Sequence, residues 1–190
     1  MLLYLHGFRS SPSSAKAQLL HKTIQAQALD IHFVAPQLPE SPLLAIETCL
    51  KLIAENKAED ESLIVMGSSL GGYYATWLAE KLACPAVLIN PCIYAARDLS
   101  TQIGQTQYYH TGEPFCFTSQ YVKELAHLFV PKVHAERYLL LAGTNDELLD
   151  WQEMVARYQG AKQVIAQGQT HAFTDLQAYL PTIFDFILAH

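Results

Sequence analysis

The sequence predicts an α/β fold in which helices cover both faces of a mostly parallel sheet, giving a compact structure of three layers. Short apolar runs alternate with stretches of helical periodicity along the 190-residue chain. The runs are apolar at nearly every position, as expected for strands that are buried on both faces. No internal repeat or linker-like segment interrupts this pattern, so we expect a single domain over residues 1–190.

Several segments have the length and composition of buried strands, and they predict a sheet of about six strands. They are Leu2–Leu5, Ile31–Val34, Leu63–Met66, Ala86–Ile89, Tyr138–Leu141 and Gln163–Ala166. The first begins almost at the N-terminus. Too few apolar residues precede His6-Gly7 for a secretory signal, so we interpret this run as a strand.

Helices are predicted between the strands from start signals and apolar spacing. Ser11 before Pro12, and Ser41 before Pro42, are pairs typical of a helix N-cap followed by the first turn. A last helix should begin near Pro181. The expected apolar faces of these three helices comprise Ala17, Leu20, Ile24 and Ala28; Leu43, Ile46, Leu50 and Ile53; and Ile183, Phe184, Ile187 and Leu188.

The stretch between Asn90 and Arg137 shows no clear strand and is longer than a simple crossover requires. A helix is expected to begin near Thr118 or Ser119. We predict a small helical and aromatic cap insertion over about residues 91–136, at the carboxyl edge of the sheet. An ordinary helical crossover with aromatic core residues is the alternative. The aromatic residues are Tyr94, Tyr108, Tyr109, Phe115, Phe117, Tyr121 and Phe129.

The composition argues against several classes of partner. A net charge of −6 without any run of Lys or Arg disfavours nucleic acid and anionic membrane surfaces. No apolar stretch approaches the roughly 20 residues needed to cross a bilayer. The four cysteines, Cys49, Cys84, Cys92 and Cys116, lack metal-binding spacing, so we expect buried free thiols in a reducing compartment. The prediction is a cytoplasmic protein without metal or cofactor.

One motif carries the chemistry. Gly67-Ser68-Ser69-Leu70-Gly71 matches the G-x-S-x-G pattern, between a strand and a helix, that forms a nucleophile elbow. In such an elbow the serine adopts a strained backbone conformation that raises its Oγ above the sheet. Glycines on either side, here Gly67 and Gly71, avoid a steric collision. We therefore predict an α/β-hydrolase with Ser69 as nucleophile; the alternative is a plain glycine-rich turn.

A serine nucleophile needs a base and an acid, which follow it in this fold in the order Asp or Glu, then His. Asp146 follows the strand Tyr138–Leu141, and His171 follows the last strand. Glu147 and Asp150 are competing acids, but we expect Glu147 to point away from Asp146 and Asp150 to be a surface acid. The less well placed histidines are His21, His32, His127 and His134.

The turn His6-Gly7-Phe8 follows the first strand, where an oxyanion hole is expected. The backbone N–H groups of Phe8 and Leu70 are the predicted donors, and Gly7 allows close backbone approach. We expect His6 to support this turn through hydrogen bonds rather than to act as a catalyst. Arg9 either binds an anionic group of the substrate or, as we prefer, is a solvated or ion-paired surface residue.

The segments LLYLHGFRSSPSSAKA, APQLP, GSSLGGYYATWLAEK, GTNDELLD and THAF, together with Asn90-Pro91, closely resemble the YqiA/YcfP-like esterases of bacteria. The resemblance covers nearly the whole chain and is weakest in the predicted cap. It implies a compact α/β-hydrolase that lacks the usual first two strands of the superfamily. It also implies Ser69, Asp146 and His171 as the triad, with activity on acyl esters and, as a further class, acyl-CoA thioesters.

The leading hypothesis is a serine esterase that hydrolyses small carboxylic esters through a covalent acyl-enzyme. The alternative is an acyl-CoA thioesterase, which would need basic residues for the coenzyme phosphates. Candidates for that role are Arg9, Lys16, Arg97, Lys123 and Lys132. A non-catalytic binding protein is less favoured because all triad members are present. An aromatic cap would suggest an apolar acyl pocket.

Overall fold

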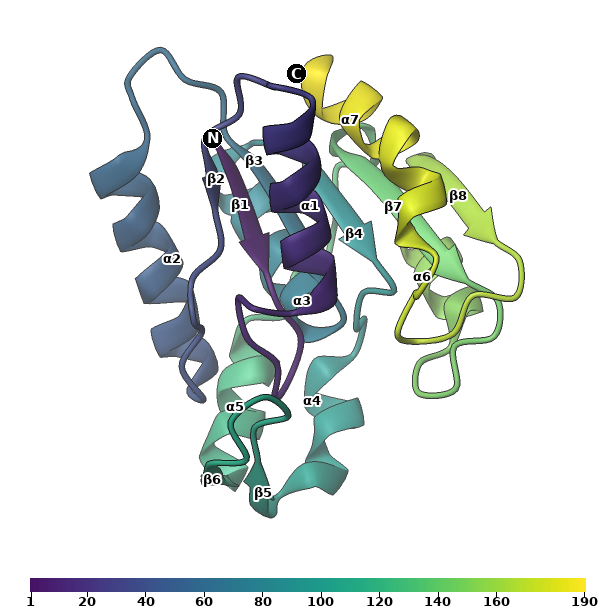
Figure 1. Ribbon diagram of the computed structural model, residues 1–190. Helices are drawn as coiled ribbons and strands as arrows, with labels where there is room; N and C mark the ends of the chain where they lie inside the picture. The colour runs from purple at the N-terminus through teal and green to yellow at the C-terminus, as the bar shows by residue number, and fades with distance from the viewer.

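A six-stranded, all-parallel sheet forms the centre of the computed structural model, which describes residues 1–190 (Figure 1). The strand order is β2-β1-β3-β4-β7-β8. The strands are β1 (Leu2–Leu5), β2 (Phe33–Val34), β3 (Ile64–Ser68), β4 (Ala86–Ile89), β7 (Tyr138–Gly143) and β8 (Lys162–Ala166). All six predicted strands are present. Only β2 is much shorter than expected, because its pairing with β1 is limited to two residues.

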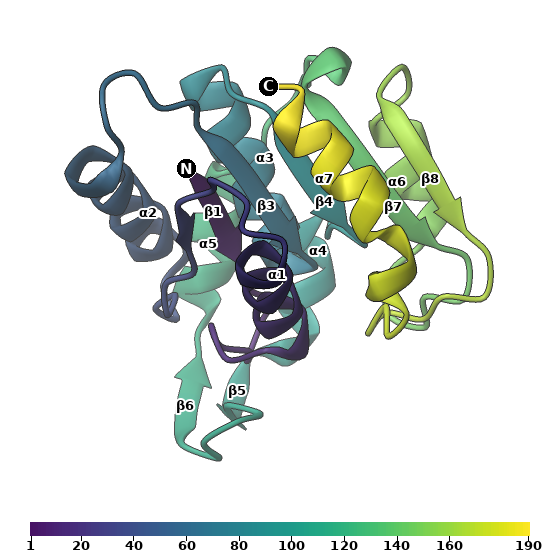
Figure 2. The same ribbon diagram turned by 45° about the horizontal axis from the view of Figure 1, so that its top comes forward.

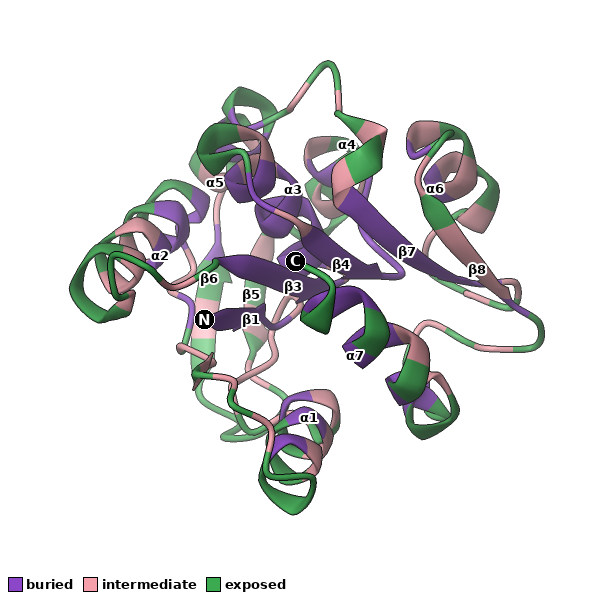
Figure 3. Ribbon diagram, turned by 90° about the horizontal axis from the view of Figure 1, so that it is seen from above, coloured by how far each residue is buried: buried purple, intermediate pink, exposed green.

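Helices cover both faces of this sheet. They are α1 (Ala15–Ala26), α2 (Pro42–Asn56), α3 (Leu70–Leu82), α6 (Trp151–Arg157) and α7 (Leu180–Leu188). Figure 3 shows α1 and α7 on one side of the buried strands and α2, α3 and α6 on the other. Alternate strand residues enter the two cores: Leu3 and Leu5 face one, and Leu2 and Tyr4 face the other. This arrangement confirms the three-layer α/β prediction.

The helix starts were only partly predicted. Helix α2 begins as expected, with the Ser41 side chain capping its first turn. The prediction for α1 is wrong, because Ser14 rather than Ser11 is its N-cap. The Ser11 hydroxyl instead accepts the N–H of Ser13 at 3.1 Å, which closes a turn before the helix. Three residues of the predicted apolar faces are exposed, namely Ala28, Leu43 and Leu188.

The segment between β4 and β7 contains helices and a hairpin. Its elements are α4 (Ala95–Leu99), η1 (Ser100–Gln102), β5 (Gly104–Gln107), β6 (Pro114–Phe117), α5 (Ser119–His127) and η2 (Ala135–Arg137); η3 (Leu176–Tyr179) precedes α7. The start of α5 agrees with the prediction, with Thr118 as N-cap. The expected absence of strands is wrong, since β5 and β6 pair antiparallel. In Figures 1 and 2, α4 and the β5–β6 hairpin lie beyond the carboxyl ends of the parallel strands, whereas η2 directly precedes β7 at the opposite edge of the sheet.

The hairpin escaped prediction because its strands carry little apolar alternation. Strand β5 reads GQTQ and buries none of its residues. Strand β6 contributes Phe115 and Phe117, whose rings lie 6.0 and 5.0 Å from that of Phe8. Contacts with a residue distant in sequence therefore hold this hairpin in place.

The cysteines also differ in part from expectation. Cys49, Cys84 and Cys92 are buried free thiols, whereas Cys116 in β6 is exposed. As for membrane spans, each helix is too short or too polar to cross a bilayer.

Candidate active site

Ser69 occupies a sharp turn between the last residue of β3 and the first residue of α3. Its backbone has φ 57° and ψ −121°, a strained conformation for a residue with a side chain. A Cβ atom at Gly67 would overlap the carbonyl of Gly71, and one at Gly71 would overlap the carbonyl of Leu5. The two predicted glycines therefore allow α3 to approach the strands closely enough to form the turn.

The structure brings the three predicted triad residues together in one chain of contacts. Ser69 Oγ lies 3.0 Å from His171 Nε2, and His171 Nδ1 lies 2.8 Å from Asp146 Oδ2. An ionised carboxylate only accepts hydrogen bonds, so the proton of the neutral imidazole belongs on Nδ1. The lone pair on Nε2 then faces the serine hydroxyl, as a general base requires.

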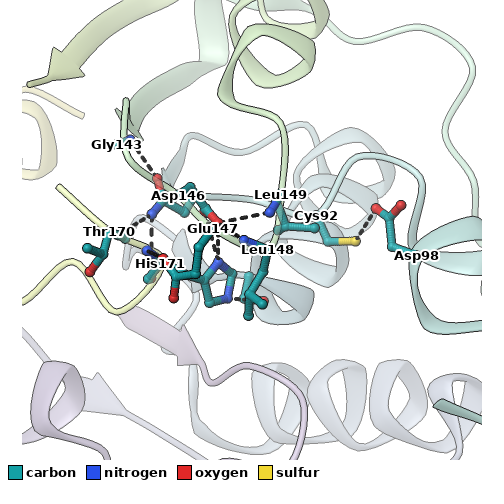
Figure 4. Close-up of polar contacts among 11 residues, drawn as sticks. Cys92, Asp98, Gly143, Asp146, Glu147, Leu148, Leu149, Thr170 and His171 are labelled. Atoms are coloured by element: carbon teal, nitrogen blue, oxygen red, sulfur yellow. Dashed lines mark hydrogen bonds and ion pairs between the residues drawn. The ribbon is translucent and has the colours of Figure 1, made fainter. Parts of the chain in front are cut away.

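Asp146 is held by more than the histidine. Its side chain is fully buried, and Oδ1 also accepts the N–H groups of Leu148 and Leu149, both at 2.9 Å (Figure 4). Hydrogen bonds of this kind offset the cost of burying a charged group. The carboxylate is thus fixed in orientation toward the imidazole.

The two competing acids have other partners. Glu147 Oε2 accepts the backbone N–H of His171 at 3.0 Å, and this hydrogen bond lowers the pKa of the Glu147 carboxyl below its usual value. Asp150 is exposed and caps α6 by accepting the N–H of Gln152 at 2.8 Å, as predicted for a surface acid. Glu147 therefore supports the loop of His171, while Asp146 is the one of the three acids that hydrogen-bonds to the ring.

The turn after β1 lies directly against the serine. A Cβ atom at Gly7 would lie 3.2 Å from Ser69 Cβ, so the backbone approaches closely there. The Phe8 N–H donates to no backbone carbonyl. Leu70 is the first residue of α3, where an N–H has no acceptor within the helix. Neither N–H has a backbone acceptor, as the predicted role of oxyanion donor requires.

His6 is buried and bonded at both ring nitrogens. Nε2 accepts the N–H of Leu38 at 3.1 Å, so Nδ1 carries the proton and donates to the carbonyl of Gly7 at 2.9 Å. Burial lowers the pKa of His6, which keeps the ring neutral. His6 thus supports the turn after β1, as predicted, and makes no hydrogen bond to Ser69, Asp146 or His171.

Asn90, the residue after β4, was not singled out as a site residue from the sequence. It is fully buried with φ 41°. Its Nδ2 donates to the carbonyls of Thr170 at 2.9 Å and His171 at 3.4 Å, and its Oδ1 accepts the N–H of Gly143 at 2.7 Å. Asn90 therefore joins the ends of β4 and β7 to the histidine loop. An Asn directly after a buried strand was the available signal.

A cleft of about 490 Å³ opens at the serine. Its walls come from the β1 turn, the start of α1, the elbow, the segment after β4, and the loops of Asp146 and His171. The lining residues used below are Lys16, Ser69, Asp98, Tyr109, Glu147 and His171. None of the four histidines judged less well placed lines this cleft.

The aromatic residues after β4 are mostly turned away from the cleft. Phe115 and Phe117 pack against Phe8, and among the aromatic residues of this segment only Tyr109 lines the cleft. Arg9 is neither ion-paired nor in the cleft wall. Its Nε donates to the carbonyl of Gln107 at 2.7 Å, and its guanidinium lies 4.3 Å from the ring centre of Tyr109. The aromatic side chains of this segment therefore do not form the expected apolar acyl pocket.

Comparisons of the whole chain place it among α/β-hydrolase folds. The mouse alpha/beta hydrolase domain-containing protein 10 superposes with a TM-score of 0.74 at 16% identity, covering 98% of this chain and 88% of that one. Est1E from Butyrivibrio proteoclasticus, solved with ferulic acid, gives 0.78 at 14% identity over 99% and 88%. A Pyrococcus furiosus esterase gives 0.67 at 17% identity over 99% and 81%. These similarities establish the fold.

Sequence comparison identifies the family. Members from Yersinia pseudotuberculosis and Yersinia pestis are 26% identical to this chain over 192 residues, covering 98% of each protein. The family model of an uncharacterised protein family, UPF0227, matches residues 1–188. This chain therefore belongs to UPF0227, the family indicated by its resemblance to the YqiA/YcfP-like esterases.

Proposed function

We propose that this protein is a serine hydrolase of carboxylic esters. The observation that carries this proposal is the continuous contact chain from Asp146 through His171 to Ser69, which ends at an open cleft. Two free N–H groups beside the serine add the expected site for an oxyanion. Esterases among the structural neighbours are consistent with this activity.

The reaction begins when His171 Nε2 accepts the hydroxyl proton as Ser69 Oγ attacks the ester carbonyl. The N–H groups of Phe8 and Leu70 stabilise the tetrahedral oxyanion, and Asp146 stabilises the imidazolium that forms. The imidazolium then protonates the leaving alcohol, and an acyl-enzyme remains on Ser69. Water, deprotonated by His171, attacks this second ester and releases the acid, which restores the free enzyme.

Oxygen esters fit the charges around the cleft better than coenzyme A thioesters do. Of the basic residues considered for the coenzyme phosphates, only Lys16 lines the cleft. Arg97 forms hydrogen bonds with the carboxylates of Asp98 and Glu153, and Arg9 donates a hydrogen bond to the backbone of the hairpin. A single lysine is a poor match for a ligand with several phosphate groups.

We further place substrate selection in residues 91–136, the cap-like insertion. It contributes Asp98, Tyr109 and neighbouring residues to the cleft wall, whereas the triad comes from the sheet edge. Because the insertion supplies this wall, its sequence would decide which acyl or alcohol groups enter.

The test is hydrolysis of p-nitrophenyl esters, from acetate to palmitate, by the wild type, Ser69→Ala and Ser68→Ala. Ser68 is the matched control, because its hydroxyl belongs to the same turn but has no part in the contact chain. We expect hydrolysis by the wild type and Ser68→Ala, with a loss of roughly 10⁴-fold or more in Ser69→Ala. Equal activity of Ser69→Ala and the wild type would overturn the proposal.

A parallel assay compares the oxygen ester and the thioester of the same acyl chain. Preference for the thioester would move the assignment to the alternative activity. Absence of turnover with both, together with retained ligand binding, would favour a non-catalytic binding protein.

A further inference from the structure

Lys16 is a cationic residue in the cleft that the proposed reaction does not use. It is the second residue of α1, and its side chain lines the same cleft as Ser69 and His171. The side chain is partly buried, and burial lowers the pKa of its ammonium group, with the charge of Asp146 acting in the opposite direction. A cationic side chain thus shares the cleft with Ser69 and His171.

The ammonium group of Lys16 has no partner within the protein. No hydrogen bond or ion pair joins it to another residue, and Nζ is not sealed from solvent. The carboxylate of Asp146 is fully buried and already accepts three N–H donors. An ammonium group that is partly removed from water and unpaired raises the free energy of the folded state.

The stability of helix α1 does not explain why a lysine stands in its first turn. The first turn of a helix carries partial positive charge, so acidic residues are favoured there and a lysine is unfavourable. Helix α1 has no acidic residue in its first turn to compensate. Neither the position of Lys16 in the helix nor a hydrogen-bonded partner accounts for this residue, and its place in the cleft wall points to a role in binding.

The acidic residues of the cleft differ from Lys16 because other protein groups donate hydrogen bonds to their carboxylates. Asp98 accepts from Arg97 Nε at 2.7 Å. It also accepts from the thiol of Cys92 at 3.3 Å (Figure 4). Glu147 accepts the N–H of His171 and is exposed, so water and salt screen its repulsion of an anion. Lys16 is less exposed than Glu147, so its charge is screened less, and its ammonium group has no hydrogen-bonded partner within the protein.

We propose that Lys16 binds a carboxylate group of the substrate, so that this site prefers esters that carry a negative charge. This inference rests on the proposed ester hydrolysis. A compact ammonium group on a flexible stem suits one carboxylate. The carboxylate could belong to the acyl chain, as in a monoester of a dicarboxylic acid, or to the alcohol part.

The experiment measures kcat/KM for two pairs of esters. In the first pair the acyl chain differs: mono-p-nitrophenyl adipate against p-nitrophenyl hexanoate. In the second pair the alcohol part differs: 4-(hexanoyloxy)benzoate against phenyl hexanoate. The ratio of anionic to neutral ester is compared between variants, so that intrinsic reactivity cancels. Variants are Lys16→Met, Lys16→Arg and, as a control on the exposed surface of the same helix, Lys22→Met.

We expect Lys16→Met to lower the ratio about tenfold to a hundredfold for one pair, the range for a hydrogen bond to a charged group. Lys16→Arg should retain most of the preference, and Lys22→Met all of it. High salt should lower the ratio in the wild type but not in Lys16→Met. Lys16→Gln provides the same comparison if methionine disturbs the fold. The pair that responds shows which part of the ester carries the carboxylate.

The possible failures can be told apart. If neither neutral nor anionic esters are hydrolysed in a Ser69-dependent manner, the proposed function itself is wrong. If they are hydrolysed but both ratios are the same in the wild type, Lys16→Met and Lys16→Gln, the role of Lys16 is overturned and the esterase proposal stands.

Discussion

The triad edge and the cap-like insertion face the same cleft, but different interactions hold them. At the triad edge, directional hydrogen bonds determine the position of each reacting group. Asp146 accepts three N–H donors, and Asn90 joins three backbone segments. The insertion combines polar contacts, none of which involves Asp146 or His171, with apolar packing such as that of Phe117 against Phe8.

Several polar contacts connect the insertion to the rest of the protein, among them the hydroxyl of Tyr108, which donates to Glu40 at 2.7 Å, and the ion pair of Arg97 with Glu153. Arg9 bonds to the hairpin backbone, and the buried Glu124 of α5 accepts the hydroxyl of Ser41 at 2.7 Å and the N–H of Leu43 at 3.3 Å. Hydrogen bonds are sensitive to small displacements, whereas apolar packing tolerates substitution if volume is kept. We infer that the edge determines the chemistry and that the insertion can vary its lining without disturbing it.

The largest difference in kcat is expected between variants of two adjacent acidic residues, Asp146 and Glu147. Asp146→Asn should lower kcat roughly 10⁴-fold, because an amide in place of the carboxylate favours the wrong tautomer of His171. Glu147→Gln should lower it only a fewfold, since a glutamine oxygen can still accept the backbone N–H of His171. Steady-state kinetics of both variants check this. Equal losses would show that the ring of His171 is not oriented by Asp146 alone.

Asn90→Ala should have the next largest effect. It leaves the buried N–H of Gly143 without a partner, at about 1–3 kcal/mol, and removes one of the two N–H donors to the carbonyl of Thr170. We expect a lower free energy of unfolding in urea and a clear fall in kcat, because the histidine loop loses its anchor. Asn56→Ala, which removes an exposed side-chain hydrogen bond, is the control. Loss of stability with unchanged kcat would contradict the positioning role.

Phe117→Ala addresses the insertion. The side chain is buried, so its removal should reduce the free energy of unfolding by about 3 kcal/mol. We expect a smaller fall in kcat than for Asn90→Ala, since the triad bonds remain. Phe129→Ala, at an exposed position, should cost less stability. Urea unfolding measures the change in stability, and steady-state kinetics measures the change in kcat. A larger fall in kcat for Phe117→Ala than for Asn90→Ala would contradict the proposed difference between the triad edge and the insertion.

The smallest expected effect is on the pH dependence of stability, through His6 in the turn His6-Gly7-Phe8. Burial lowers the pKa of His6, so the unfolded chain binds a proton more readily than the folded protein. The contribution of His6 to stability is therefore complete above pH about 6.5 and is lost as pH falls below that value. Melting temperatures at pH 7.5 and 5.5 should differ more for the wild type than for His6→Gln. An equal difference in both would exclude His6 as the source.

Local patterns predicted the sheet and the triad edge well, for a physical reason. Buried parallel strands and a strained elbow impose local requirements, namely continuous apolar runs and glycines where a Cβ would clash. The three predicted triad residues follow strand ends, so their meeting at one edge follows from the parallel topology. The residues Ser69, Asp146 and His171 could therefore be chosen from the sequence.

The missed features depend on contacts between distant segments. The hairpin β5–β6 has almost no apolar alternation of its own and packs on Phe8. The bonds of Asn90 reach residues of two other loops, which no local pattern reveals. Likewise, Ser11 and Ser14 are both suitable caps, and only the folded structure distinguishes them.

The most direct test of the central claim is to trap the acyl-enzyme. The wild type and His171→Ala are mixed rapidly with a p-nitrophenyl ester, quenched in acid and digested, and the modified peptide is located by mass spectrometry. We predict that the wild type carries the acyl group on Ser69, whereas His171→Ala carries almost none because its serine is not activated. Hydrolysis that proceeds with no acyl group on Ser69, or with the acyl group on another residue, would contradict the assignment of Ser69 as the nucleophile.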